Sequence, residues 1–203
     1  MNNQKTAIVT GASRGIGASI ADRLAADGFN VIVNYANSKK AAKEVVDRIV
    51  NSGGTAMIAR ADVAKGDDVK SLFDAAQQAY GGVDVVVNNA GIMHLAKFVD
   101  GEDEQFDRQV AVNFKGTYNT LREAAKHLRD GGSVINLSTS VVGLKLETYG
   151  VYAATKAAVE TMTAIFSKEM RGRNINVNAV APGPTATDLF LEGKSEEVVN
   201  KLI

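Results

Sequence analysis

A glycine-rich turn near the start of the chain joins an apolar run to a helical pattern. The run Ala7–Val9 leads directly into Thr10–Gly17, which reads TGASRGIG. A strand that turns sharply into a helix needs residues without a Cβ where φ is positive or where a ligand approaches the backbone. The first turn of the helix then presents unpaired N–H groups and a partial positive charge. We expect this turn to hold a phosphate or pyrophosphate, although its glycine spacing differs from the commonest dinucleotide motif.

Strand-like and helix-like segments alternate along the chain. Six short runs, most of them rich in Val and Ile, lack a regular polar alternation, as strands buried on both faces of a parallel sheet do. These runs cover residues 6–10, 30–34, 55–60, 83–87, 133–138 and 175–180. Helical patterns cover residues 15–28, 38–52, 67–80, 102–128 and 152–171, with glycines at several of their ends, among them Gly131-Gly132. The alternation predicts one doubly wound, Rossmann-like α/β domain with a parallel sheet over residues 1–203.

Composition excludes several kinds of site. Lys plus Arg equals Asp plus Glu at 23 each, so no overall field attracts nucleic acid or an anionic membrane. The absence of Cys removes disulfides and thiolate metal sites. His94 and His127 lie far apart without metal-ligand spacing. No apolar run approaches the roughly 18 residues of a membrane span. We expect a cytoplasmic protein without a metal ion, a nucleic-acid partner or a membrane partner.

Further motifs follow the glycine loop in a fixed order: Asn88-Asn89-Ala90-Gly91, then Asn113, Tyr152-x-x-x-Lys156 and Pro182-Gly183. With them the chain resembles the short-chain dehydrogenase/reductase superfamily over most of its length. The segments at 149–156 and 179–184 resemble those of 3-oxoacyl carrier-protein reductases and polyhydroxynaphthalene reductases. The resemblance implies hydride transfer between a nicotinamide coenzyme and a small-molecule carbonyl, in a homodimer or homotetramer. It also implies a final strand beyond residue 203, so we expect a sheet that lacks this strand.

Tyr152 and Lys156 are four residues apart in a helical pattern, so their side chains project from one face. A phenol ordinarily titrates near pKa ~10, and an adjacent ammonium group favours the phenolate. We expect Lys156 to lower the pKa of Tyr152, which would let Tyr152 act as general acid and base. The three donors of Lys156 would also hold the nicotinamide ribose hydroxyls. Taken alone, the spacing also fits a packed aromatic beside a solvated lysine.

The resemblance implies a second hydroxyl group that orients the carbonyl oxygen, and Ser138, Thr139 and Ser140 are the candidates. The family's commonest spacing before Tyr152 selects Thr139. The following Val141–Gly143, however, resembles the segment after the catalytic serine of carrier-protein reductases, which selects Ser140. Ser138 fits if the loop is longer. We choose Ser140 as the predicted catalytic residue.

By resemblance, coenzyme contacts come from several separate parts of the chain. Asn113 is implied to order a water on a proton relay through Lys156, and Asp62 to accept from the adenine amino group. The full set of implied coenzyme contacts at the loop, at the adenine, after the fourth strand and beside the carboxamide is Gly11, Ser13, Arg14, Gly15, Ile16, Gly17, Asp62, Val63, Asn88, Ala90, Gly91, Tyr152, Lys156, Pro182, Gly183, Thr185 and Thr187.

The end of the second predicted strand bears on the choice of coenzyme. Sites that prefer NAD usually place a carboxylate there for the ribose 2′-hydroxyl. Residues 34–38 read NYANS and contain no acid. Arg14 and Ser38 can instead hold an extra phosphate. We predict NADP(H), with Asn34 as a further contact.

We therefore expect an NADPH-dependent reductase of an apolar ketone or quinone. Residues 187–203 are predicted to form a substrate lid, with a short helix from residue 189 that has Ser195 as a cap. The candidates to line the substrate site are Leu189, Phe190, Leu191, His94 and Leu144. The alternatives are a catalytically impaired or non-catalytic NADP-binding protein or redox sensor, and a structural α/β domain that binds no coenzyme.

Overall fold

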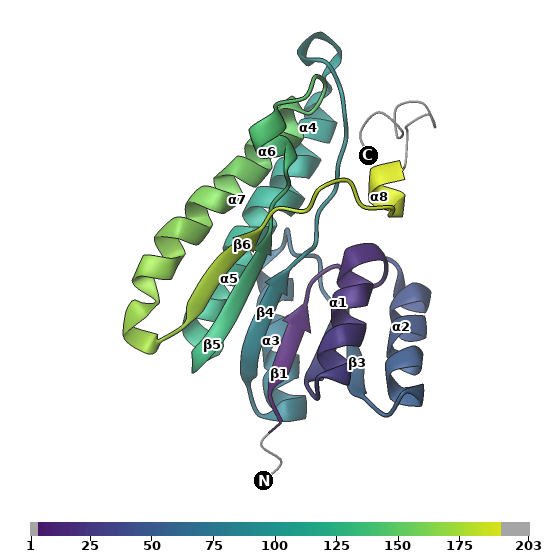
Figure 1. Cartoon of the computed structure of the whole chain (residues 1–203), viewed down its shortest axis with the longest axis vertical. Helices are drawn as coiled ribbons and strands as arrows, with labels where there is room; N and C mark the ends of the chain where they lie inside the picture. Colours follow the sequence, from purple (N-terminus) through teal and green to yellow (C-terminus); the bar gives the residue numbers. More distant parts are fainter. Residues whose placement is uncertain (1–3, 192–203) are drawn as a thin grey trace.

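The computed structural model describes residues 4–191 as six strands interleaved with helices (Figure 1). The strands are β1 (Thr6–Val9), β2 (Asn30–Tyr35), β3 (Thr55–Arg60), β4 (Val83–Asn88), β5 (Leu128–Leu137) and β6 (Asn176–Val180). The longer helices are α1 (Gly15–Ala26), α2 (Lys39–Asn51), α3 (Gly66–Tyr80), α4 (Asp103–Gln109), α5 (Gly116–His127) and α7 (Gly150–Glu169). Short helical segments are η1 (Phe98–Asp100), η2 (Val110–Lys115), α6 (Val141–Leu144), η3 (Arg171–Arg173) and α8 (Asp188–Leu191). The predicted lid residues 192–203, Ser195 among them, lie outside the described residues.

The six strands form one parallel sheet in the order β3-β2-β1-β4-β5-β6. Ile8 pairs with Ile32 on one side and with Val86 on the other, so β1 lies between β2 and β4. The strand order reverses at this point, and open parallel sheets bind ligands beyond the carboxyl ends of such strands. The predicted doubly wound fold is therefore confirmed, and its binding edge lies where β1 and β4 end.

Both faces of the sheet are buried, which explains the missing polar alternation. On one face Ile8 packs with α3, α5 and α7, through residues such as Phe73 and Phe166. On the other face Val9 packs with α1 and α2, through residues such as Ala21 and Val45. In Figure 1, α1 and α2 lie beside each other away from α5 and α7. The two helical layers thus hold the ends of β1 and β4 between them.

One predicted helix, residues 102–128, is divided by the structure. The π-helical turn η2 separates α4 from α5, and β5 begins at Leu128 without a glycine cap. The predicted role of Gly131-Gly132 as a helix end is wrong, because both lie inside β5 where its register with β4 shifts. The guanidinium of Arg173 instead donates to the carbonyl oxygens of Ala125 and Leu128, and so satisfies the helix end from a distant part of the chain.

No helix within residues 4–191 combines the length and apolar character that a membrane span requires.

Candidate active site

The glycine loop after β1 packs tightly against the loop after β4. Gly11 and Gly15 have φ values of +60° and +55°, a region that favours glycine. A Cβ on Gly11 would lie 2.8 Å from the Cα of Ala90, and one on Gly17 would lie 2.7 Å from the carbonyl oxygen of Gly11. The unusual glycine spacing therefore reflects a close approach of two backbones, which leaves the start of α1 open toward the cleft.

Asn89 connects these two loops, a role that sequence reasoning did not assign. Its side-chain amide donates to the carbonyl oxygens of Thr10 and Gly11 at 2.9 and 3.1 Å. The Thr10 hydroxyl in turn accepts from the backbone N–H groups of Asn89 and Ala90, both at 3.0 Å. The signal was available, because Asn89 belongs to the Asn-Asn-Ala-Gly motif. Its neighbour Asn88 is buried and donates to the Asn136 side chain at 2.7 Å, so it links β4 to β5.

Asn34 supports the glycine loop from the opposite side. Its side-chain oxygen accepts from the backbone N–H of Gly11 at 3.1 Å. Its amide group donates to the carbonyl oxygens of Ala59 and Ala61 at 3.2 and 3.1 Å. The side chain is only 2% exposed. Asn34 thus lies at the predicted position, but its polar atoms hold the protein's own backbone.

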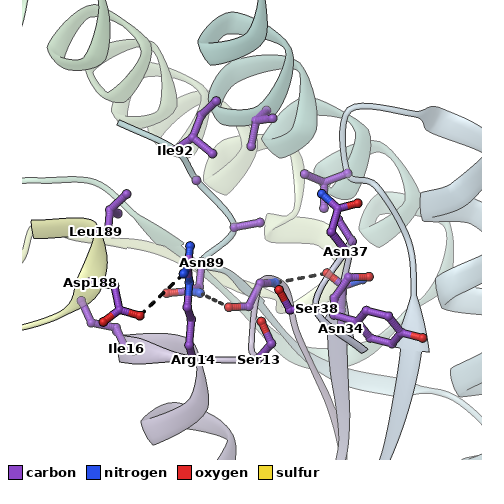
Figure 2. A pocket seen from close by; sticks show the side chains of 18 of the residues that line it. Ser13, Arg14, Ile16, Asn34, Asn37, Ser38, Asn89, Ile92, Asp188 and Leu189 are labelled. Atoms are coloured by element: carbon purple, nitrogen blue, oxygen red, sulfur yellow. Dashed lines mark hydrogen bonds and ion pairs between the residues drawn. The ribbon is translucent and has the colours of Figure 1, made fainter. Parts of the chain in front are cut away.

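A cleft of about 450 Å³ opens over the glycine loop (Figure 2). It brings together predicted coenzyme residues from the ends of β1, β2, β3 and β4, and adds Arg108 and residues 186–189, among others. Arg14 extends across its mouth, where a guanidinium nitrogen lies 3.6 Å from a carboxylate oxygen of Asp188 (Figure 2). Asn34 and Ser38 lie on the other side of the cleft in the same view. The predicted members that line it are Gly11, Ser13, Arg14, Gly15, Ile16, Asn34, Ser38, Asp62, Val63, Ala90, Gly91 and Thr187.

Asp62 and Val63 form the part of the cleft that follows β3. A carboxylate oxygen of Asp62 accepts from the N–H of Ala64 at 3.1 Å, and the other lies 3.5 Å from an Arg108 nitrogen. Val63 packs against Gly116, where an added Cβ would approach to 2.7 Å. Arg108 was not predicted, because only the folded chain brings α4 close to the loop after β3 that carries Asp62.

Tyr152 and Lys156 lie on α7 beneath a second pocket, and both side chains are buried. The Lys156 ammonium nitrogen donates to the carbonyl oxygen of Leu137 at 2.7 Å. Burial lowers the pKa of Lys156 from 10.5 to about 8.

The pKa of Tyr152 departs from our expectation. Burial raises the pKa of the phenol above its usual value, and a hydrogen bond with the Thr139 hydroxyl opposes that rise. The predicted lowering of this pKa by Lys156 is therefore wrong for the described structure. The reason is geometric, since the ammonium group is directed at Leu137 and lies 5.9 Å from the centre of the Tyr152 ring.

The three candidate hydroxyl groups at the end of β5 have different surroundings. Ser138 donates to a Glu160 carboxylate oxygen at 2.5 Å. Thr139 lines the same pocket as Tyr152, its hydroxyl accepts from the N–H of Val141 at 3.3 Å, and its interaction with the phenol acts to lower the pKa of Tyr152. Ser140 is partly buried and lines the same pocket as Tyr152. Thr139 is thus the hydroxyl in contact with the phenol, and Ser138 is committed elsewhere.

Asn113 lies in the π-helical turn η2 and faces the loop after β4. Its side-chain oxygen accepts from the N–H of Ile92 at 2.9 Å, and its amide donates to the Ile92 carbonyl at 2.8 Å and to Thr155 at 3.2 Å. A Cβ on Gly91 would lie 3.4 Å from this oxygen and 3.5 Å from the Lys156 nitrogen. Asn113 and Lys156 therefore meet at Gly91, where the two pockets join.

The second pocket, of about 170 Å³, is largely apolar. Three of the predicted lining residues, Leu144, Leu189 and Phe190, border it. His94 and Leu191 do not border it. Sequence reasoning missed Met93, Leu146 and Pro184 on loops and Val141 at the start of α6, and it treated Tyr149 as packing alone. Of the remaining predicted coenzyme residues, Pro182, Gly183 and Thr185 also line this pocket, whereas Gly17 and Asn88 line neither pocket.

Among the described residues, no group of three or more His, Cys, Asp or Glu side chains is arranged to hold a metal ion.

Comparison with known proteins gives a consistent result. The family model described as short chain dehydrogenase matches residues 5–197. A short-chain type dehydrogenase/reductase from Picea abies is 45% identical over 205 residues, which cover 96% of this chain and 76% of the relative. A short chain dehydrogenase from Burkholderia cenocepacia J2315 in complex with NADP has a TM-score of 0.92 at 35% identity, covering 97% of this chain and 81% of that one. The angucycline C-6 ketoreductase LanV with bound NADP has a TM-score of 0.91 at 37% identity, covering 98% and 79% respectively.

Proposed function

This chain belongs to the short-chain dehydrogenase/reductase family of oxidoreductases, and from that membership we propose that it reduces the carbonyl group of a ketone or quinone with NADPH. One observation carries the proposal. The pocket over Tyr152 and Lys156 is continuous with the cleft over the glycine loop, since Ile16, Asn89, Gly91, Thr187 and Leu189 border both. A nucleotide held in the larger cleft would therefore end beside the phenol.

The residues of the larger cleft suit a dinucleotide. The start of α1 supplies backbone N–H groups for the pyrophosphate, and the positive φ of Gly11 and Gly15 allows the sharp turn that brings them to the cleft. Asp62 lines the cleft and would accept from the adenine amino group, while Lys156 would donate to the nicotinamide ribose hydroxyls. When bound, NADPH supplies the hydride.

We assign the 2′-phosphate of the coenzyme to Arg14, with Ser13 and Ser38 beside it. Arg14 is exposed at the mouth of the cleft, and residues 34–38 carry no carboxylate that would repel a phosphate. The Burkholderia cenocepacia dehydrogenase and LanV, which this chain resembles, contain NADP. Asn34 acts indirectly in this proposal, by holding the N–H of Gly11.

Tyr152 is the proposed general acid that protonates the carbonyl oxygen. The substrate oxygen must lie within hydrogen-bond reach of the phenol, and the hydroxyl already in contact with that phenol belongs to Thr139. We therefore favour Thr139 as the group that orients the carbonyl and keep Ser140 as its competitor. Asn113 remains the proposed anchor of a water next to Lys156, and its bonds to Ile92 fix the backbone there.

The first test compares coenzymes and then turnover. Fluorescence titration should give tighter binding of NADPH than of NADH, and NADPH should be consumed with members of a panel of ketones and quinones. Tyr152→Phe should bind NADPH normally and lose nearly all turnover. Tight NADPH binding by the parent without turnover of any carbonyl would favour a sensor, and no binding at all would favour a structural domain.

Thr139→Val and Ser140→Ala separate the two hydroxyl candidates. If Thr139 orients the substrate, T139V should lose most of kcat while S140A keeps most of it. If S140A loses most of kcat while T139V keeps most of it, Ser140 is the residue that orients the substrate.

Self-association and a cytoplasmic location are also part of the proposal. Phe106, Phe114 and Tyr118, spaced along α4, η2 and α5, are 49%, 39% and 49% exposed, which favours a second copy against this face. Sedimentation velocity of the purified chain tests for a dimer or tetramer.

A further inference from the structure

Helix α7 carries a third polar side chain on the face that bears Tyr152 and Lys156. Glu160 follows Lys156 by four residues, so the three side chains are stacked one turn apart. They face three consecutive residues at the end of β5. Lys156 donates to the Leu137 carbonyl and Glu160 accepts from the Ser138 hydroxyl, while Tyr152 lines one pocket with Thr139, whose hydroxyl acts to lower the pKa of the phenol.

We propose that Glu160 is a positioning residue of the active site. By accepting the Ser138 hydroxyl it holds the end of β5 so that the Thr139 hydroxyl faces Tyr152. The proposal rests on the proposed function, because it gives Glu160 a role in orienting the carbonyl that is reduced.

Ser138 is well placed to transmit this effect. It is 4% exposed, and its backbone N–H donates to the Val180 carbonyl at 2.7 Å. Two positions later, the N–H of Ser140 donates to the Pro182 carbonyl at 3.0 Å. The residues on both sides of Thr139 are therefore held by the segment that contains β6. From α7, Glu160 fixes the same turn by accepting the Ser138 hydroxyl.

The bond itself is a strong one for its type. The oxygen atoms of Ser138 and Glu160 are 2.5 Å apart, the separation typical of a hydroxyl that donates to a carboxylate. Such bonds are roughly twice as strong as neutral ones. Without Glu160, the buried Ser138 hydroxyl would lose this acceptor, and the turn would be held by β6 and the adjacent chain alone.

A displacement of about 1 Å in a group that orients a substrate can cost about 10²-fold in rate. We therefore expect Glu160→Ala to lower kcat by roughly ten- to a hundredfold. The dissociation constant for NADPH should change less than twofold, because the glycine loop and Arg14 are held by other contacts. Glu160→Gln keeps an oxygen acceptor for Ser138 and should recover most of kcat.

Ser138, the other partner in this hydrogen bond, gives an independent variant. Ser138→Ala removes the donor with a small change in volume, so it should reproduce the effect of Glu160→Ala. If Glu160 acts through Ser138, the double variant should be no worse than either single variant. Glu169→Ala is the matched control, because Glu169 is an exposed carboxylate on the same helix.

Two measurements decide the proposal. Hydrogen exchange reports the backbone N–H groups of Ser138 and Ser140 directly, and both should exchange faster in E160A than in the parent, E160Q or E169A. Steady-state kinetics with NADPH and either ethyl acetoacetate or phenanthrenequinone then separates kcat from KM. In a T139V background, adding E160A should cause only a small further loss of kcat.

Unchanged exchange at these two amides together with an unchanged kcat in both E160A and S138A would overturn the proposal. So would a failure of E160Q to recover kcat while S138A stays at the parental rate. If E160A does not fold, E160Q and S138A carry the test. If the parent reduces neither probe, the proposed function fails, whereas the exchange measurement still decides whether Glu160 holds the end of β5.

Discussion

Replacing Asn34 by Asp tests whether the end of β2 reads the coenzyme or supports the glycine loop. On the general rule for dinucleotide sites, a carboxylate at this place would favour NAD. The structure predicts a different result, because the Asn34 side chain bonds Gly11, Ala59 and Ala61 and is 2% exposed. Asn34→Asp keeps the acceptor for the Gly11 N–H, but it replaces a donor with an oxygen that faces two carbonyl oxygens.

The expected loss of stability follows from these bonds. Each hydrogen bond contributes about 1 kcal/mol, and an unsatisfied buried group costs about 1–3 kcal/mol. Asn34→Ala should therefore lower the free energy of unfolding by about 2–4 kcal/mol, and Asn34→Asp by at least as much at neutral pH. The new carboxyl group should have a raised pKa in the folded state, since its environment disfavours the charge. N34D should accordingly be more stable at acidic pH, where the new carboxyl group is protonated, and this added stability should be lost as the pH rises through the folded-state pKa.

Urea unfolding of N34D at acidic and neutral pH measures this effect, and fluorescence titration measures the affinities for NADPH and NADH. Asn37→Asp is the matched control, because Asn37 is exposed at the same end of β2 and lines the same cleft. Its stability should stay within about 0.5 kcal/mol of the parent. An N34D variant as stable as N37D that has gained affinity for NADH would refute the reasoning.

Four further predictions concern Arg14, Asp188, Lys156 and Arg173. Arg14→Gln should weaken NADPH binding about tenfold, the loss of one charge-assisted contact, and leave NADH binding unchanged. Asp188→Asn should free Arg14 and tighten NADPH binding a few-fold, with no effect in an R14Q background, because an exposed pair at 3.6 Å is worth at most about 1 kcal/mol. Burial lowers the pKa of Lys156 from 10.5 to about 8. Between these two pH values the unfolded chain binds more protons than the folded protein, so the free energy of unfolding should rise with pH. Urea titrations should show a rise of up to about 3 kcal/mol relative to Lys156→Met. Arg173→Ala should lower the free energy of unfolding by about 2–3 kcal/mol in the same assay, because it removes the bonds to Ala125 and Leu128 and the ion pair with Asp130. An unchanged free energy of unfolding would refute the role of Arg173 at the end of α5.

The sequence alone determined the parts of this protein that depend on local patterns. Val- and Ile-rich runs such as residues 30–34 predicted buried parallel strands, because a strand covered on both faces has no reason to alternate, and the strand there is Asn30–Tyr35. The glycines of the first turn predicted an open helix start, since the ability to adopt a positive φ is a property of glycine itself. The spacing of Tyr152 and Lys156 placed them on one helical face for the same local reason.

Only the tertiary structure decided which atoms remain available at the site. The local sequence showed Asn34 as a polar residue at a strand end, but Gly11, Ala59 and Ala61 use its side chain. The sequence left three adjacent hydroxyl groups, Ser138, Thr139 and Ser140, as candidates and favoured Ser140, whereas Glu160 and Tyr152 distinguish them through interactions from another element. The pKa of Tyr152 likewise depended on burial and on where the Lys156 ammonium group points. Such outcomes depend on partners far away in the chain, whose distances and burial are set only when the helices pack onto the sheet.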